Sequence, residues 1–249
     1  MPSPDSSGLA FINGVNLYFA IFNKTAKEPV ILLHGGFGSS ADWSFEVPLL
    51  SATHKVIVMD TRGHGRSAMD NLPFSYEQFA ADLTVLMDRL HIRQSSIVGW
   101  SDGGITGLVM AIQHPSRVNK LFTYGSNYNK SGEKDEPFDS LLAAKFMMRA
   151  KANYRRLSPT PDGFSNFRAQ IAKMYATQPN LDTIALHSIH LPVVIGCGDH
   201  EQFYTLAHFE SLAKLIPGAA LRVLPAVSHG GPWQDPVSLH AAVVNLLDK

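Results

Sequence analysis

Short apolar runs alternate with longer amphipathic stretches along most of this chain. A continuous apolar run such as 29–33 is typical of a strand buried on both faces. We expect strands at 9–12, 15–21, 29–33, 55–60, 95–100, 118–124, 193–197 and 220–224. Helical periodicity predicts helices at 76–91, 102–113 and 204–216, and a last helix capped by Asp235. This alternation predicts an α/β fold with a mostly parallel, doubly wound sheet of about eight strands.

Local signals support two of these elements. Asn13-Gly14 is a favoured tight turn, so the first two strands should form a hairpin. Ser75, followed three residues later by Gln78, forms a capping box, which predicts a helix that begins at residue 76.

The alternation breaks once, between about residues 128 and 189. Helices are expected there over 138–152 and 164–176, with no strand between them. Ligands of open α/β sheets bind beyond the carboxyl ends of the strands, so we interpret this insertion as a cover over that edge. The chain therefore divides into a core domain, residues 1–127 and 190–249, and a helical lid at 128–189.

Composition narrows the functional class without naming a function. The chain has 249 residues, 45% of them hydrophobic, and a formal net charge of zero, which suits a globular protein with a large core. No basic stripe is evident, so nucleic acid is not an expected partner. No apolar run approaches the roughly 20 residues needed to cross a membrane, and no membrane partner is expected. A single cysteine, Cys197, and an amino terminus unlike a signal peptide predict a cytoplasmic protein, either a monomer or a homodimer.

The candidate nucleophile is Ser101, in the run Gly99-Trp100-Ser101-Asp102-Gly103. An apolar strand precedes this Gly-x-Ser-x-Gly pattern and a helix-forming stretch follows it, which is the context of a nucleophile elbow. Side chains at the two glycines would collide where the strand and the helix pass each other, so glycine is required at both positions.

A serine needs a base to remove its proton, and histidine is the usual one because its pKa lies near working pH. Among eleven histidines, His229 stands out because it follows the last predicted strand and precedes the last helix, at the same sheet edge as Ser101. A carboxylate must orient that histidine. The loop after the strand at 193–197 offers two, Asp199 and Glu201, and the residue pattern leaves both open.

An oxyanion formed by attack needs backbone donors. One should be the N–H of Asp102, the residue after the nucleophile. The other should come from the glycine-rich loop after the strand at 29–33, from Gly36 or Phe37, which spacing does not separate. Candidate substrate contacts are Trp100, which adjoins the nucleophile, and also Trp43, Tyr128 and Met147, each of which could equally be core or lid packing.

In these motifs the chain resembles the α/β-hydrolase superfamily over nearly its full length. The matching landmarks are Leu32-Leu-His-Gly-Gly-Phe-Gly38, Asp60-Thr-Arg-Gly-His-Gly-Arg-Ser67, Gly99-Trp-Ser-Asp-Gly103, Gly198-Asp-His-Glu201 and Val227-Ser-His229. The continuation Gly99-Trp-Ser-Asp-Gly-Gly104 is similar to that of small bacterial and fungal serine esterases.

The resemblance implies a choice of acid and an activity. In relatives the acid commonly lies nine residues after the proline that opens its strand; nine residues after Pro192 stands Glu201, where aspartate is usual, and Asp199 is the alternative. Aspartate at 102, where many relatives carry methionine or glutamine, is a second departure, best explained as a favourable charge at a helix start. The implied activity is hydrolysis of small-molecule carboxylic esters through an acyl-enzyme, without cofactor or metal.

Several alternatives stay open at this point. Similar machinery serves lactonases, thioesterases and hydrolases of carbon–carbon bonds, and some members of the superfamily act as weakly catalytic small-molecule receptors. The run Gly36-Phe-Gly-Ser-Ser-Ala41 also fits a dinucleotide-binding fingerprint, with Asp60 at the end of the next strand. That interpretation leaves Ser101 and His229 without a role, so we favour the hydrolase.

Overall fold

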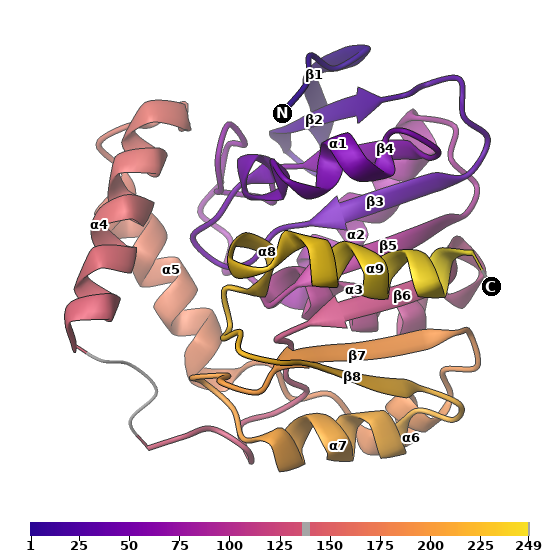
Figure 1. Cartoon of the computed structure of the whole chain (residues 1–249). Helices are drawn as coiled ribbons and strands as arrows, with labels where there is room; N and C mark the ends of the chain where they lie inside the picture. Colours follow the sequence, from indigo (N-terminus) through magenta and orange to yellow (C-terminus); the bar gives the residue numbers. More distant parts are fainter. Residues whose placement is uncertain (136–139, 249) are drawn as a thin grey trace.

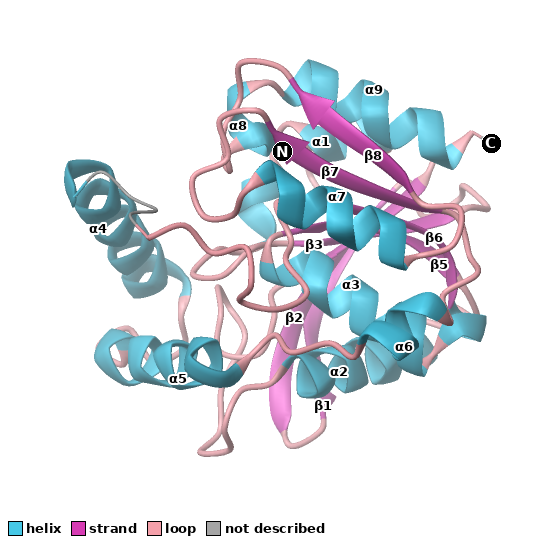
Figure 2. Ribbon diagram, turned by 90° about the horizontal axis from the view of Figure 1, so that it is seen from below, coloured by secondary structure: helices cyan, strands magenta, loops and turns pink. Residues whose placement is uncertain are grey.

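The structure is a computed structural model that describes residues 1–135 and 140–248. A central sheet carries helices on both faces (Figures 1 and 2). Its strands are β1 (Ser6–Ile12), β2 (Val15–Phe22), β3 (Pro29–Leu33), β4 (Lys55–Met59), β5 (Ser95–Trp100), β6 (Val118–Tyr124), β7 (Val193–Gly198) and β8 (Ala220–Leu224). The eight strands predicted from the apolar runs are confirmed.

The strand order in the sheet is β1-β2-β4-β3-β5-β6-β7-β8. β1 and β2 are antiparallel, as is the pair β2 and β4, and the strands from β4 to β8 are parallel. Parallel strands end at a common edge, so the loops that follow β3, β5, β7 and β8 lie together. These loops carry the candidate chemistry predicted from the sequence.

Two apolar clusters, one on each face, hold the helices to the sheet. α2 (Tyr76–Arg89), α3 (Asp102–Gln113), α6 (Thr183–His187) and α7 (Leu206–Leu215) contribute to one cluster. α1 (Glu46–Leu50) and α9 (Pro236–Leu247) contribute to the other. Short helical turns complete the connections at η1 (Ser40–Trp43), η2 (Pro115–Arg117) and α8 (Gly231–Gln234). β5, at the centre of the sheet, is buried along its whole length.

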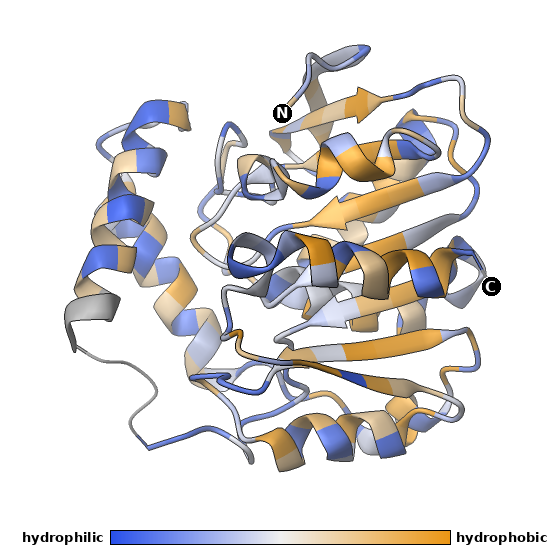
Figure 3. Cartoon of the chain, in the orientation of Figure 1, coloured by the Kyte–Doolittle hydropathy of each residue, from blue (hydrophilic) through white to orange (hydrophobic). Residues whose placement is uncertain are grey.

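The helices α4 (Ser140–Leu157) and α5 (Phe164–Thr177) stand outside these layers, beside the carboxyl edge of the sheet (Figure 1). Both helices contain more hydrophilic residues than the strands, which are mostly hydrophobic (Figure 3). The sequence also placed residues 183–187 in the lid, but α6 contacts α3 and α7 and so packs with the core. The lid boundaries at 128 and 189 otherwise stay a prediction. The first two residues of the helix expected at 138–152, residues 138 and 139, lie outside the described part of the chain.

No helix in the described part of the chain combines the length and apolar character that a membrane span requires.

Candidate active site

Ser101 occupies a strained turn between β5 and α3. Its backbone has φ 52° and ψ −118°, a conformation that costs a residue other than glycine about 1–3 kcal/mol. A Cβ at Gly99 would overlap the backbone of Gly103 and Gly104, and one at Gly103 would overlap the carbonyl of Leu33. The strand, the turn and the helix therefore pass too closely for side chains at these two positions. The arrangement has the geometry of a nucleophile elbow, in which the serine stays partly exposed.

His229 reaches the same place from the loop between β8 and α8. The indole Nε1 of Trp100, the neighbour of Ser101, donates to the carbonyl oxygen of His229 at 2.9 Å. The imidazole lies against Gly125, where a Cβ would come within 2.8 Å of Nδ1. The ring of Phe203 packs on it edge-to-face, with ring centroids 4.5 Å apart. The backbone of His229 is thus tied to Trp100, and its ring lies against Gly125 and Phe203.

Of the two candidate acids, the structure brings Glu201 to the histidine. His229 Nδ1 lies 2.9 and 3.0 Å from the two carboxylate oxygens of Glu201, which is only 4% exposed. The Asp199 side chain is 43% exposed, and its ion-pair partner is the still more exposed His200, 3.8 Å away. With Nδ1 as the donor, Nε2 is left unprotonated, which is the tautomer a general base requires.

Free backbone donors lie at the expected oxyanion position. Within the described residues, the N–H groups of Gly36, Phe37 and Asp102 have no hydrogen-bond acceptor in the protein. Phe37 has a positive φ of 61°, so its peptide group is oriented differently from that of a residue in an extended loop. Unpaired donors of this kind beside a nucleophile can hold an oxygen that gains negative charge.

Asp102 is more elaborately held than a helix-start residue needs to be. One carboxylate oxygen accepts from the Tyr76 hydroxyl at 2.9 Å, and the other accepts from the Tyr175 hydroxyl at 2.8 Å. Burial raises the pKa of Asp102, and the two tyrosine hydrogen bonds oppose that rise. Neither tyrosine was predicted to belong to the site, because each looks like an ordinary apolar-face residue of its own helix.

The four tentative substrate contacts are placed unequally. Trp43 is 1% exposed inside the apolar cluster beneath α1 and α9, and Tyr128 stacks on His208 with ring centroids 4.5 Å apart. Packing accounts for both, so we no longer expect them to contact substrate. Trp100 is adjacent to Ser101 and donates to the backbone carbonyl of His229. Met147 is partly exposed on the lid helix α4.

The lid also contacts the loops around the site. The guanidinium of Arg149 on α4 lies 3.9 Å above the ring of Trp233, which follows His229 in α8. The same group is 3.8 Å from the carboxylate of Asp42, in η1. A cation over an aromatic ring contributes about 0.5–1 kcal/mol at exposed sites, so this contact is a modest clamp.

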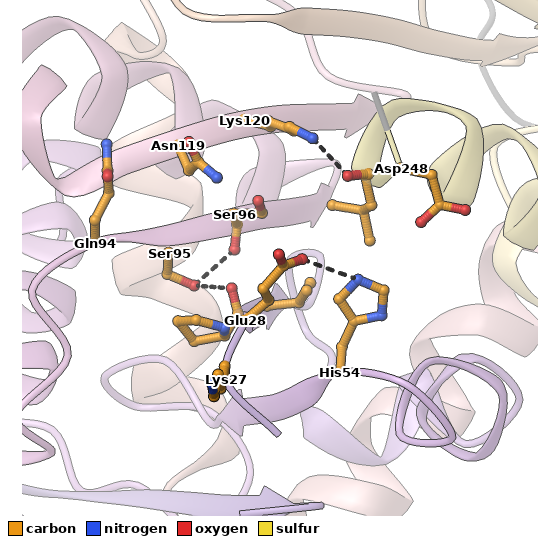
Figure 4. A pocket seen from close by; sticks show the side chains of 12 residues that line it. Lys27, Glu28, His54, Gln94, Ser95, Ser96, Asn119, Lys120 and Asp248 are labelled. Carbon is orange, nitrogen blue, oxygen red and sulfur yellow. Dashed lines mark hydrogen bonds and ion pairs between the residues drawn. The ribbon is translucent and has the colours of Figure 1, made fainter. Parts of the chain in front are cut away.

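A hollow of about 590 Å³ lies elsewhere in the described molecule. It opens at the amino ends of the strands, lined among others by His54, Gln94 and Lys120 (Figure 4). Its position at the opposite end of β3 and β5 separates it from Ser101. The site geometry is therefore a better guide to the chemistry than the size of a cavity.

The dinucleotide-binding alternative meets an obstacle in the fold. The glycine-rich loop leads into the four-residue turn η1, whereas a pyrophosphate site needs the start of a longer helix. Asp60 is fully buried and accepts backbone hydrogen bonds from Ser40 and Arg66, so it is not free for a ribose. Among the described residues, no three His, Cys, Asp or Glu side chains are grouped as a metal site would require.

Comparisons with known proteins agree with this fold. The family model described as alpha/beta hydrolase fold matches residues 28–177. A protein of Caulobacter segnis, named provisionally as the carbamate hydrolase RutD, is 37% identical over 89% of this chain and 92% of its own length. The serine hydrolase BPHL of Mus musculus is 27% identical over 90% of this chain and 80% of its own length.

A solved structure, the enol-lactonase from Burkholderia xenovorans LB400, superposes with a TM-score of 0.79. The superposition covers 97% of this chain and 100% of the enol-lactonase chain, at 22% sequence identity, and therefore supports only the fold.

Proposed function

The chain belongs to the alpha/beta hydrolase family, and from that premise we propose that it is a serine hydrolase that cleaves carboxylic esters of small molecules through an acyl-enzyme. One observation carries the proposal: a strained, partly exposed serine, a histidine paired with a buried glutamate, and unpaired backbone donors meet at one edge of the sheet. Each part alone has an ordinary structural explanation, but together they match the needs of acyl transfer.

The steps assign one role to each residue. Ser101 Oγ attacks the carbonyl carbon of the ester while His229 Nε2 takes the hydroxyl proton. The N–H groups of Asp102 and of Gly36 or Phe37 bind the oxyanion, and Glu201 stabilises the imidazolium. As the tetrahedral intermediate collapses, His229 gives the proton to the leaving alcohol. A water molecule, deprotonated by His229, then attacks the acyl-enzyme. As this second tetrahedral intermediate collapses, His229 returns the proton to Ser101 Oγ and the carboxylic acid is released.

Carbamates are a second candidate class, because the Caulobacter relative carries that name. A carbamate presents the same carbonyl to the nucleophile, but its nitrogen lone pair reduces the electrophilicity of the carbon. The same catalytic groups would therefore serve, with slower acylation. Lactones and thioesters use the same steps and differ only in the leaving group.

A substrate panel tests the proposal. Purified protein is assayed against chromogenic esters of increasing acyl length, a lactone, a thioester and a carbamate, each with wild type and with Ser101→Ala. We expect ester turnover that the substitution abolishes. Ester turnover retained by Ser101→Ala, or none by the wild type on any member, would overturn the proposal. Turnover confined to the carbamate would select the second class.

A further inference from the structure

The lid helix α5 reaches the candidate oxyanion site through the hydroxyl of Tyr175. Its hydroxyl donates to the Asp102 carboxylate at 2.8 Å and lies so close to Gly36 that a Cβ there would overlap it. The carboxylate is near the same glycine, because the same Cβ would be 2.7 Å from Asp102 Oδ2. One lid hydroxyl therefore touches both segments that supply the unpaired N–H groups.

Asp102 links its side chain to the reaction through its own backbone. Its N–H is a proposed oxyanion donor, and its carboxylate is 6% exposed and bonded on both oxygens. Tyr76 supplies one of these bonds from α2, within the core, and Tyr175 supplies the other from the lid. A buried carboxylate that loses one donor is left under-bonded, so it reorients or becomes protonated, and its peptide group moves with it.

The other donor segment also rests on the lid. The ring of Phe37 packs edge-to-face on Phe167 of α5 at 5.6 Å and on Phe146 of α4 at 6.3 Å, measured between centroids. Phe37 has a positive φ, so its backbone depends on such packing to stay in place. At the end of α5, the Gln178 side-chain oxygen accepts a hydrogen bond from the backbone N–H of Tyr76 at 3.1 Å. This bond connects the end of α5 to the start of α2.

We propose that Tyr175 is a positioning residue for the oxyanion site. Its hydroxyl donates to Asp102 and packs against Gly36, and so holds the backbone donors of both segments in working geometry. The inference rests on the proposed hydrolase function and goes beyond it, because it makes the oxyanion site depend on a docked lid. Tyr175 itself contacts no reacting atom in this scheme. Preorganised donors contribute most when they are already in place as charge develops, so loosening them should affect the transition state more than substrate binding.

The test is Tyr175→Phe, which removes the hydroxyl and keeps the ring. With the best ester of the panel we expect kcat to fall by about tenfold to hundredfold, with KM changed by less than about twofold. The affinity for a phenylboronic acid inhibitor, whose boron becomes tetrahedral on bonding to Ser101, should fall by a similar factor. A purely structural effect would not weaken binding of the tetrahedral inhibitor while leaving the KM of the substrate unchanged.

A matched control exists in the same lid. Tyr154 on α4 is also buried, and its hydroxyl lies 3.1 Å from Thr160 Oγ1 within the lid; among the described residues it has no hydrogen bond to the core. Tyr154→Phe should keep kcat within about twofold of wild type, although it deletes the same atom. Because Tyr175 acts through the carboxylate, adding Asp102→Asn to Tyr175→Phe should cost no more than the larger single substitution.

Three results would overturn the inference: an unchanged kcat in Tyr175→Phe, an equal loss in Tyr154→Phe, or additive losses in the double variant. Thermal melting of each variant shows whether it is folded, and a variant that unfolds early is assayed at lower temperature. Failure of the proposed function looks different, because Ser101→Ala then retains ester turnover whatever residue 175 is.

Discussion

Glu201→Gln is the substitution that separates the two candidate acids most sharply. Glutamine has nearly the same shape, so the loop between β7 and α7 should be preserved. The carboxylate lies 2.9 and 3.0 Å from His229 Nδ1, and Oε1 also accepts the Phe203 N–H at 3.0 Å. If the amide oxygen keeps the Phe203 bond, its NH₂ faces Nδ1 and favours the tautomer whose Nε2 is protonated and cannot act as a base.

The expected loss is large because the pair is desolvated. The Glu201 side chain is 3% exposed and that of His229 is 15% exposed, so water cannot replace the lost charge. Comparable removal of the orienting carboxylate in serine proteases lowers kcat about 10⁴-fold. We expect a fall of about 10³–10⁴-fold, equivalent to about 4–5.5 kcal/mol in the barrier. The half-exposed Asp199 provides the control, and Asp199→Asn should stay within about twofold of wild type.

Both variants are assayed by initial rates with a chromogenic ester, and circular dichroism checks that each is folded. A crippled Asp199→Asn beside an active Glu201→Gln would show that the loop rearranges in solution and that the assigned acid is wrong. Equal losses in both would show that the loop, rather than one carboxylate, supports the histidine.

Three further predictions concern the scaffold. Gly103→Ala places a methyl group against the Leu33 carbonyl, which is backbone and cannot move aside cheaply, so ester turnover should be lost and the melting temperature should fall. Ser75→Ala removes the side-chain oxygen that caps α2 at 3.0 Å, and denaturant titration should find it about 1 kcal/mol less stable. Burial lowers the pKa of His64 to about 3 and that of His208 to about 4, whereas both rings protonate near pH 6.5 in the unfolded chain. The free energy of unfolding should therefore fall as the pH drops below about 6.5, by about 2 kcal/mol per ring at pH 5. An unfolding free energy as high at pH 5 as at pH 7 would show that these rings are hydrated.

The strand pattern was predictable because burial on both faces leaves continuous apolar runs. Asn13 and Gly14 have positive φ angles of 45° and 87°, as the predicted hairpin turn requires. Ser75 caps α2 as expected, although α2 ends at Arg89 rather than 91. The five-residue α6 was missed because it is too short to show a helical period.

The site was predictable only where topology or spacing constrains it. Parallel strands place Ser101, His229 and the acidic loop at one edge, and the resemblance to the α/β-hydrolase superfamily, through the distance from Pro192, implies Glu201. Nothing local distinguishes Tyr175, because it lies 73 residues from its partner Asp102 and falls on a helix face that looks like core. Such long-range polar contacts appear only when the lid is placed in space.

The central claim, that Ser101 is activated by His229 and attacks a carbonyl, is tested most directly by covalent labelling. The protein is treated with a fluorophosphonate ester, digested, and the adduct is located by mass spectrometry in wild type, Ser101→Ala and His229→Ala. We predict about one adduct per chain, on Ser101, absent from Ser101→Ala and formed at least about 10²-fold more slowly in His229→Ala. An adduct on another residue, or labelling of Ser101 at an unchanged rate without His229, would contradict the account.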